Sequence, residues 1–173
     1  MQWFLTLATV VYLVPFIVSG SEGGNRFVDF SLEDPQAKKY SQSDMEGKIT
    51  LVVLQSRTTL QIAVDCKTEL KSLTQGNQKV QMIAIMDLRQ RPSLAPKFAI
   101  KKKISLQDPT SKEFPFLLDW EGEVTKALGG EDSKCMILIV DPALNIVYKQ
   151  EYKQASVNDE IKPLLDKLSG GQK

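Results

Sequence analysis

Histidine is absent from this 173-residue chain, and cysteine occurs only twice, as Cys66 and Cys135. The lack of histidine removes the commonest metal ligand and general base, and two isolated cysteines cannot supply the CxxC pairs of a zinc site. The 22 Lys and Arg residues nearly balance the 21 Asp and Glu residues, so no overall field attracts nucleic acid. We therefore expect no metal, no cofactor and no nucleic-acid partner.

An apolar segment without any charge, WFLTLATVVYLVPFIV, occupies residues 3–18, and the small residues Ser19, Gly20 and Ser21 follow it. This order is typical of a secretory signal peptide cleaved after Gly20. An uncleaved anchor that contacts the membrane through residues 3–18 is the first alternative. A buried helix is the second alternative, because this segment is shorter than the roughly 20 residues that a bilayer span needs. The segment predicts an exported, periplasmic or otherwise extracytoplasmic protein, either soluble or anchored.

The rest of the chain has the length and composition of one globular domain, with 42% hydrophobic and 25% charged residues. We assign residues 1–20 to the signal or anchor, 21–26 to a spacer, 27–168 to the domain and 169–173 to a polar tail. Alternating and continuous apolar runs predict a hairpin over 27–41, strands over 49–54 and 80–86, an extended piece over 114–119 and a hairpin of strands 135–140 and 145–151. Helices are expected over 59–74, 91–103, 121–128 and 157–168, the last capped by Ser156.

Four short motifs occur in a fixed order along this pattern. They are FVDFSLED at 27–34, YSQSDMEGK at 40–48, FPFLLD at 114–119 with KALG at 126–129, and IVDP at 139–142 followed by Ile146 and Val147. Together they resemble the TlpA and peroxiredoxin branch of the thioredoxin-like superfamily. The resemblance implies an α/β fold with a central mixed sheet, βαβ and ββα halves, flanking helices and an N-terminal hairpin extension.

The residues that carry chemistry in that superfamily are replaced here. Counted from Gly47 and Lys48, the two redox cysteines of the family fall near Thr59 and Ile62, and its cis-proline falls near Cys135. Without a thiolate at these positions, thiol–disulfide exchange and peroxide reduction lose their nucleophile. The segment Ser56-Arg57-Thr58, the export signal and the missing thiols are most similar to the exported YtfJ family of bacterial proteins.

The two cysteines stand at different places in this frame. Cys66 shares a helical stripe with Ile62, Leu70 and Leu73, which favours a structural thiol in the core. Cys135 begins a buried strand on the floor of the former redox site, where an accessible thiol is the alternative. We expect the two cysteines to lie too far apart for a disulfide.

A vestigial binding groove is the candidate site that remains. Arg57, Thr58 and Thr59 follow the central strand and open a helix, and Lys134 and Cys135 precede a later strand. Free N–H groups, a guanidinium and a strand edge there would suit an anionic group or an extended peptide. The alternative is an ordinary helix cap beside a solvated arginine.

A run of three lysines, Lys101 to Lys103, is the most basic feature outside that groove. It could contact acidic lipid or protein, or it could complement the negative end of a helix that stops there.

These observations predict a non-enzymatic, exported or membrane-tethered thioredoxin-like module that binds protein partners, for example within an envelope or membrane complex. One alternative is an atypical thiol peroxidase or disulfide oxidoreductase that uses Cys66 or Cys135. Another is a binder of a small anionic ligand or peptide at the vestigial groove.

Overall fold

The structure is a computed structural model that describes residues 25–170, with the side chains of residues 111 and 112 left out. The predicted signal or anchor and most of the polar tail lie outside the described residues. Between residues 25 and 170, no helix is both long enough and apolar enough to cross a membrane.

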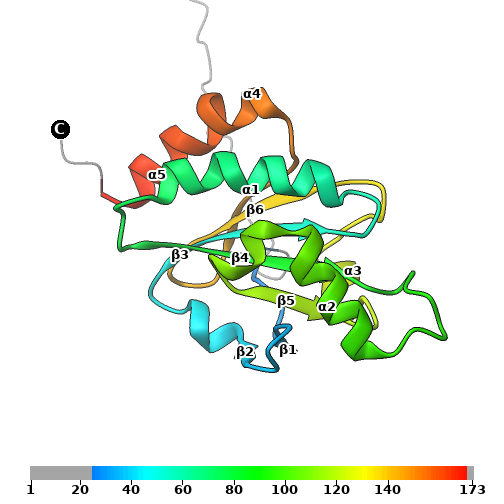
Figure 1. The fold of residues 1–173 in the computed structure, drawn as a ribbon. Helices are drawn as coiled ribbons and strands as arrows, with labels where there is room; N and C mark the ends of the chain where they lie inside the picture. The colour runs from blue at the N-terminus through cyan, green and yellow to red at the C-terminus, as the bar shows by residue number, and fades with distance from the viewer. Residues whose placement is uncertain (1–24, 171–173) are drawn as a thin grey trace, which may run out of the picture.

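A seven-stranded mixed sheet with the order β2-β1-β5-β4-β3-β6-β7 forms the centre of the domain (Figure 1). β3, β4 and β5 run parallel, whereas β6 pairs antiparallel with β3 and β7 antiparallel with β6. The continuous aliphatic runs of β3 and β4 favour this central position, because strands covered on both faces need apolar side chains throughout. The strands are β1 Ser31–Glu33, β2 Lys39–Ser41, β3 Ile49–Gln55, β4 Val80–Asp87, β5 Phe116–Asp119, β6 Met136–Val140 and β7 Ile146–Glu151.

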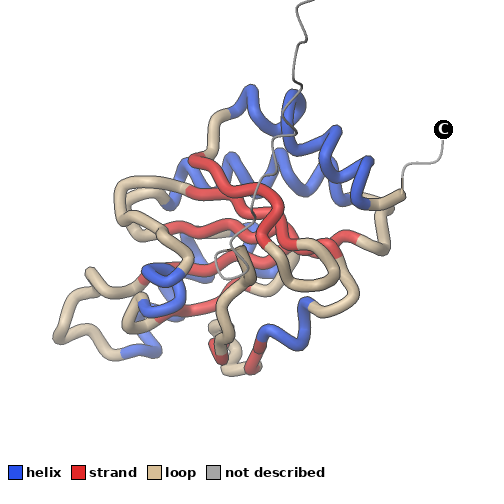
Figure 2. The backbone as a smooth tube through the Cα atoms, turned by 180° about the vertical axis from the view of Figure 1, so that it is seen from behind, coloured by secondary structure: helices blue, strands red, loops and turns tan. Residues whose placement is uncertain are grey.

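Helices cover both faces of this sheet and divide the core into two layers. One layer packs α1, α2 and the C-terminal helical segment against the sheet, and the other packs α3 and the N-terminal segment against the opposite face. Figures 1 and 2 show α1 beside the C-terminal helical segment on one side of the sheet. The helices are α1 Leu60–Thr74, α2 Lys97–Gln107, α3 Glu123–Ala127, α4 Gln154–Ser156 and α5 Lys162–Leu168, and single 3₁₀ turns lie at Gln42–Met45 and Pro109–Lys112.

Several element boundaries differ from those that the sequence predicts. The N-terminal hairpin is present, but β1 begins at Ser31 rather than at residue 27. Its turn is held by Asp34, whose carboxylate accepts the N–H groups of Gln36 and Lys38 at 2.9 Å each. The second helix begins at Lys97 rather than at residue 91, because Pro96 is readily accommodated only at the start of a helix.

The C-terminal helix begins at residue 154, so the predicted cap at Ser156 is wrong. Ser156 lies inside the helical segment, and its hydroxyl donates to the Lys153 carbonyl at 2.6 Å. A π-helical turn, Val157–Ile161, separates α4 from α5, which carries Pro163. Proline lacks an N–H and its ring crowds the carbonyl four residues earlier, so a wider turn before it relieves a clash that a regular α-helix would impose.

The buried face of α1 is rotated relative to the predicted stripe. Cys66 and Leu70 are buried as expected, but the Ile62 side chain is 48% exposed. Lys67 takes a place in the interior and is fully buried. The helix therefore packs a charged residue against the sheet, and the hydrophobic spacing alone did not indicate this.

Candidate functional site

The candidate site lies at the edge of the sheet where the parallel strands β3, β4 and β5 end and β6 begins. Ligands of open α/β sheets commonly bind beyond the carboxyl ends of parallel strands. The turn after β3, Ser56 to Thr59, and the loop between β4 and α2 meet at this edge, where the Arg57 Nη1 donates to the Gln90 carbonyl at 3.0 Å. The candidate residues Arg57, Thr58 and Thr59 therefore lie at the sheet edge where ligands of this class of fold commonly bind.

The turn after β3 is fastened by its own hydroxyl groups. The Ser56 N–H donates to the Thr59 Oγ1 at 2.9 Å, and the Ser56 Oγ donates to the Asp132 carbonyl at 2.6 Å. The Thr58 hydroxyl also donates to the Asp132 carbonyl. Thr59 occupies the N-cap position of α1, but its side chain makes no capping hydrogen bond, because it serves the turn instead. Ser56 and Thr58 thus hold the loop before β6 against the start of α1, and Thr59 fastens the turn itself.

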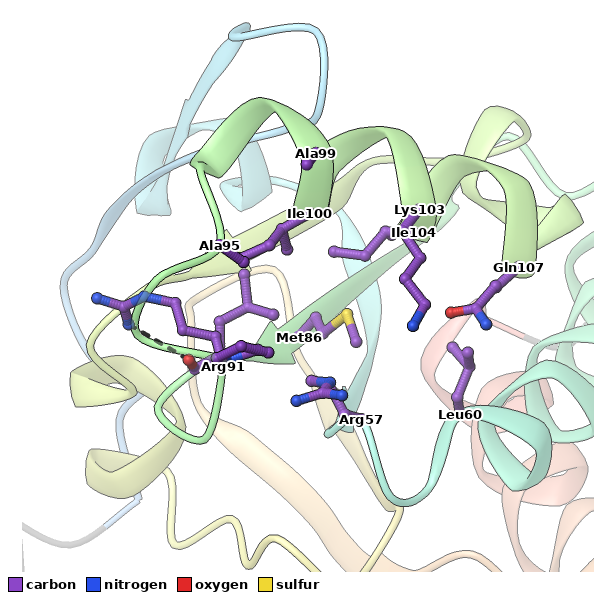
Figure 3. Close-up of a pocket in the computed structure, with 12 residues that line it drawn as sticks. Arg57, Leu60, Met86, Arg91, Ala95, Ala99, Ile100, Lys103, Ile104 and Gln107 are labelled. Atoms are coloured by element: carbon purple, nitrogen blue, oxygen red, sulfur yellow. Dashed lines mark hydrogen bonds between the residues drawn. The ribbon is translucent and has the colours of Figure 1, made fainter.

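A pocket of about 370 Å³ opens beside this turn, between α1 and α2 (Figure 3). Its volume is within the usual range for small-molecule sites. Eight of the twelve residues that line it are apolar, and the other four are two arginines, one lysine and one glutamine, with no acidic residue. The apolar lining comes from Leu60, Met86, Leu88, Pro92, Ala95, Ala99, Ile100 and Ile104, and the polar lining from Arg57, Arg91, Lys103 and Gln107.

Two of these cations face the pocket without an acidic partner. Figure 3 shows the Lys103 side chain reaching from α2 toward Arg57 and Leu60, with the Gln107 amide beside it. Within the described part of the chain, no carboxylate lies within ion-pair distance of Arg57 or Lys103. Positive charge beside an apolar cavity suits an anion that carries an apolar body.

The third cation of the pocket is already neutralised. The Arg91 Nη2 donates to the Glu121 Oε1 at 3.0 Å, and its Nη1 donates to the Trp120 carbonyl. Figure 3 shows its guanidinium directed away from Lys103. Arg91 therefore shapes the wall of the pocket, whereas Arg57 and Lys103 supply its charge.

The other predicted site residues do not join this pocket. Cys135 is buried in the core layer beneath α1, and Lys134 forms an ion pair with Glu131 at 2.7 Å. The fold brings only Arg57 of the five predicted residues to the pocket wall. Binding at the other four stays a prediction.

The residues that the sequence analysis missed come from β4 and α2. Met86 forms part of the lining because it lies near the end of β4, opposite Gln55 of β3. Lys103 lies within α2, which continues to Gln107, and its side chain lines the pocket. The sequence signal for Lys103 was the lysine run itself, which was placed at a helix end. The helix runs on beyond that point, so the predicted complement to the helix dipole is wrong.

The two cysteines are neighbours in the interior, 4.3 Å apart, and both are free and buried. The prediction that the two cysteines lie far apart is therefore wrong. They are neighbours because α1 packs across the sheet, so that its second turn, which carries Cys66, faces Cys135 just before the start of β6. Burial raises the pKa of the Cys66 thiol well above its ordinary value, and Cys135 raises it further. A thiol in this setting is held in the unreactive protonated form at neutral pH.

A buried ion pair lies close to these thiols. The Lys67 ammonium contacts the Asp108 carboxylate, and both side chains are fully buried. Burial lowers the pKa of Lys67, while the hydrogen bond that its ammonium donates to Asp108 opposes that shift. The same ammonium lies 4.9 Å from the centre of the Phe116 ring, so the charge has both an ionic and an aromatic partner.

No three Cys, Asp or Glu side chains between residues 25 and 170 are grouped so that they could hold a metal ion.

Comparison with known proteins gives structural neighbours only. No protein-family model matches the sequence, and no curated protein matches it. A thiol-disulfide oxidoreductase from Bacteroides fragilis is 16% identical, with a TM-score of 0.62 over 80% of this chain and 98% of that one. The exposed lipoprotein thioredoxin of Streptococcus pneumoniae is 18% identical, with a TM-score of 0.63 over 82% and 100% of the two chains.

A third neighbour is a member of the Sco family of cytochrome c oxidase assembly proteins in which a disulfide switch was identified. It is 13% identical to this chain, with a TM-score of 0.63 over 86% of this chain and 95% of that chain. Identities this low establish the architecture and leave the activity open. The mixed seven-stranded sheet and its flanking helices confirm the predicted α/β fold class, and the fold is thioredoxin-like.

Proposed function

We propose that the chain is a non-enzymatic thioredoxin-like binding module whose ligand is an anion with an apolar body. The observation that carries this proposal is the pocket of about 370 Å³, which combines an apolar lining with two cations that lack acidic partners. A carboxylate placed between Arg57 and Lys103 would accept charge-assisted hydrogen bonds. The attached apolar chain would leave water for the surface formed by Leu60, Met86 and Ile100.

We also propose that the protein acts outside the cytoplasm. The apolar segment at residues 3–18 supports an extracytoplasmic module, either released or tethered. The similarity to an exposed lipoprotein thioredoxin supports the same location. A ligand-binding subunit of an envelope or membrane complex fits these features, with a partner protein supplying the chemistry that this chain lacks.

Octanoate is a suitable probe of the pocket, and its uncharged analogue octanol is the comparison. We expect calorimetry to show octanoate binding in preference to octanol. Changing Arg57→Gln or Lys103→Gln should weaken octanoate binding by about 1.5–3 kcal/mol, the usual contribution of a hydrogen bond to a charged group. Octanol binding should change little, because it does not use the charge.

Lys102→Gln is the matched control for this experiment. Lys102 is adjacent to Lys103 on α2, but it does not line the pocket, so its loss should leave octanoate binding close to that of the parent protein. Equal octanoate and octanol binding, or equal losses from Lys102 and Lys103, would refute the proposal.

The second candidate function is a thiol redox protein, and the 4.3 Å separation of the cysteines favours it. Burial and the raised pKa of the Cys66 thiol oppose it, because the thiolate is the nucleophile. We expect neither insulin reduction nor peroxide consumption above the level of the Cys66→Ala, Cys135→Ala double variant. Activity that disappears in this double variant would establish the redox function instead.

A further inference from the structure

The outer face of α2 exposes apolar side chains that a soluble surface normally hides. The exposed fractions are 73% for Phe98 and 75% for Leu106, and Leu94 just before the helix is 97% exposed. Only two other large hydrophobic side chains of the described chain, Ile62 and Val147, are exposed, and less so. Apolar exposure is therefore concentrated on one element.

These side chains are arranged along the helix, not scattered over it. Phe98, Lys102 and Leu106 follow one another at intervals of four residues, so they share one face of α2. Ile104 is buried and Ile100 half-buried on the face that packs on the sheet. The helix is apolar on both faces, and the second apolar face points to solvent.

The segment that carries this face is also strongly basic. Residues 90–107 contain five cations and no acidic residue, in a chain whose net charge is only +1. Lys101 reaches Glu33 at 3.1 Å, and Lys97 lies 4.8 Å from the centre of the Trp120 ring. Lys102, which lies outside the pocket, forms no ion pair with any described residue, so its charge is available at the surface.

The position of the segment makes it accessible to a flat surface. The loop between β4 and α2 projects from the body of the domain in Figures 1 and 2, and Leu94 lies in this loop. A projecting leucine, an exposed phenylalanine on the next turn and flanking lysines combine apolar insertion with attraction to negative charge.

We propose that this face of α2 docks the domain onto a membrane that contains anionic lipid. Leu94 and Phe98 enter the boundary between headgroups and acyl chains, while Lys102 contacts the negative headgroups. Charge complementarity favours a lipid surface over a second copy of this chain, because a second copy would bring the same lysines, Lys97 and Lys102, which lack acidic partners among the described residues, into the contact. The contact would also hold the open edge of the sheet close to the membrane.

The test is co-sedimentation of the full chain with lipid vesicles at low salt. One set of vesicles is phosphatidylcholine alone, and the other contains about one quarter phosphatidylglycerol. Residues 3–18 carry no charge, so any contact they make contributes to both sets alike. The additional binding to the anionic vesicles reports on α2, and it should disappear at high salt.

The double variant Leu94→Ser, Phe98→Ser should lower this additional binding about tenfold or more, since each side chain loses its apolar transfer free energy. Lys102→Gln should lower it about fivefold, the loss expected for one lysine at an anionic surface. Ile62→Ser, an exposed hydrophobic on α1, and Lys126→Gln, an exposed lysine on α3, are the matched controls and should leave it unchanged.

Two further measurements distinguish membrane docking from misfolding of the variant and from self-association of the chain. Octanoate binding should persist in the double variant, because neither Leu94 nor Phe98 lines the pocket, and its persistence shows that the variant is folded. Equal binding to both kinds of vesicle, or unchanged anionic binding in the double variant, would overturn the proposal. Dimerisation that depends on Leu94 and Phe98, without vesicle binding, would assign the face to a second copy and overturn it as well.

Discussion

Replacing Lys67 with methionine should lower the free energy of unfolding by about 3–5 kcal/mol, because it breaks an ion pair whose two side chains are both fully buried. Methionine fills the space of the lysine stem, so the loss reflects charge more than volume. The Thr110 N–H donates to the Asp108 Oδ1 at 3.0 Å, and this hydrogen bond does not depend on Lys67. Urea unfolding at neutral pH measures the change.

Two controls show whether the buried charge is the cause. Lys71, one turn further along α1, forms an ion pair with Glu113 at 2.7 Å, with both side chains well exposed. Lys71→Met should therefore cost less than about 1 kcal/mol. Adding Asp108→Asn to Lys67→Met should recover most of the loss, since asparagine keeps an acceptor for Thr110 and carries no charge. Equal losses for Lys67 and Lys71 would contradict the argument.

The buried ion pair also shows where sequence reasoning stops. The strands β3 and β4 were predictable, because their uninterrupted aliphatic runs can only be covered on both faces. Lys67 was not, since its partner Asp108 is 41 residues away at the end of a helix whose limits were themselves misplaced. A lysine in a helical pattern predicts a solvent-facing position, and only the tertiary partner reverses that expectation.

The candidate site was likewise predictable from the sequence only in part. The position of Arg57 at the end of β3 follows from the parallel sheet, so it could be predicted from the order of elements. The opposite wall of the pocket could not, because it depends on how far α2 continues and on which turn faces inward. Local propensity marks the lysine run, but the packing of Ile104 on the sheet decides that Lys103 faces the pocket.

Two phenylalanines occupy contrasting environments. Phe116 is 1% exposed and lies beneath the Lys67 ammonium, whereas Phe98 is 73% exposed on the outer face of α2. Phe116 lies in the apolar run at 114–118, which favours a buried strand, whereas Phe98 is followed within five residues by three lysines. Their environments therefore predict very different losses of stability for the same substitution.

Phe116→Ala should destabilise the protein by about 3–5 kcal/mol, as expected for loss of a fully buried ring and the cavity that remains. Phe98→Ala should change stability by no more than about 0.5 kcal/mol, since its ring makes few contacts to lose. Thermal and urea unfolding of the two variants, prepared side by side, give the comparison. Similar losses for the two would show that Phe98 is buried in the protein as it exists in solution.

Phe116→Leu resolves what the ring contributes beyond volume. Leucine restores much of the buried apolar surface but offers no aromatic face to the Lys67 ammonium, so the loss that remains measures the cation–π contact, about 1–2 kcal/mol for a desolvated pair. Combining Phe116→Leu with Lys67→Met then tests the coupling directly. If the ring and the ammonium stabilise each other, the two changes together cost less than the sum of their separate effects, because the second removes an interaction that the first has already broken.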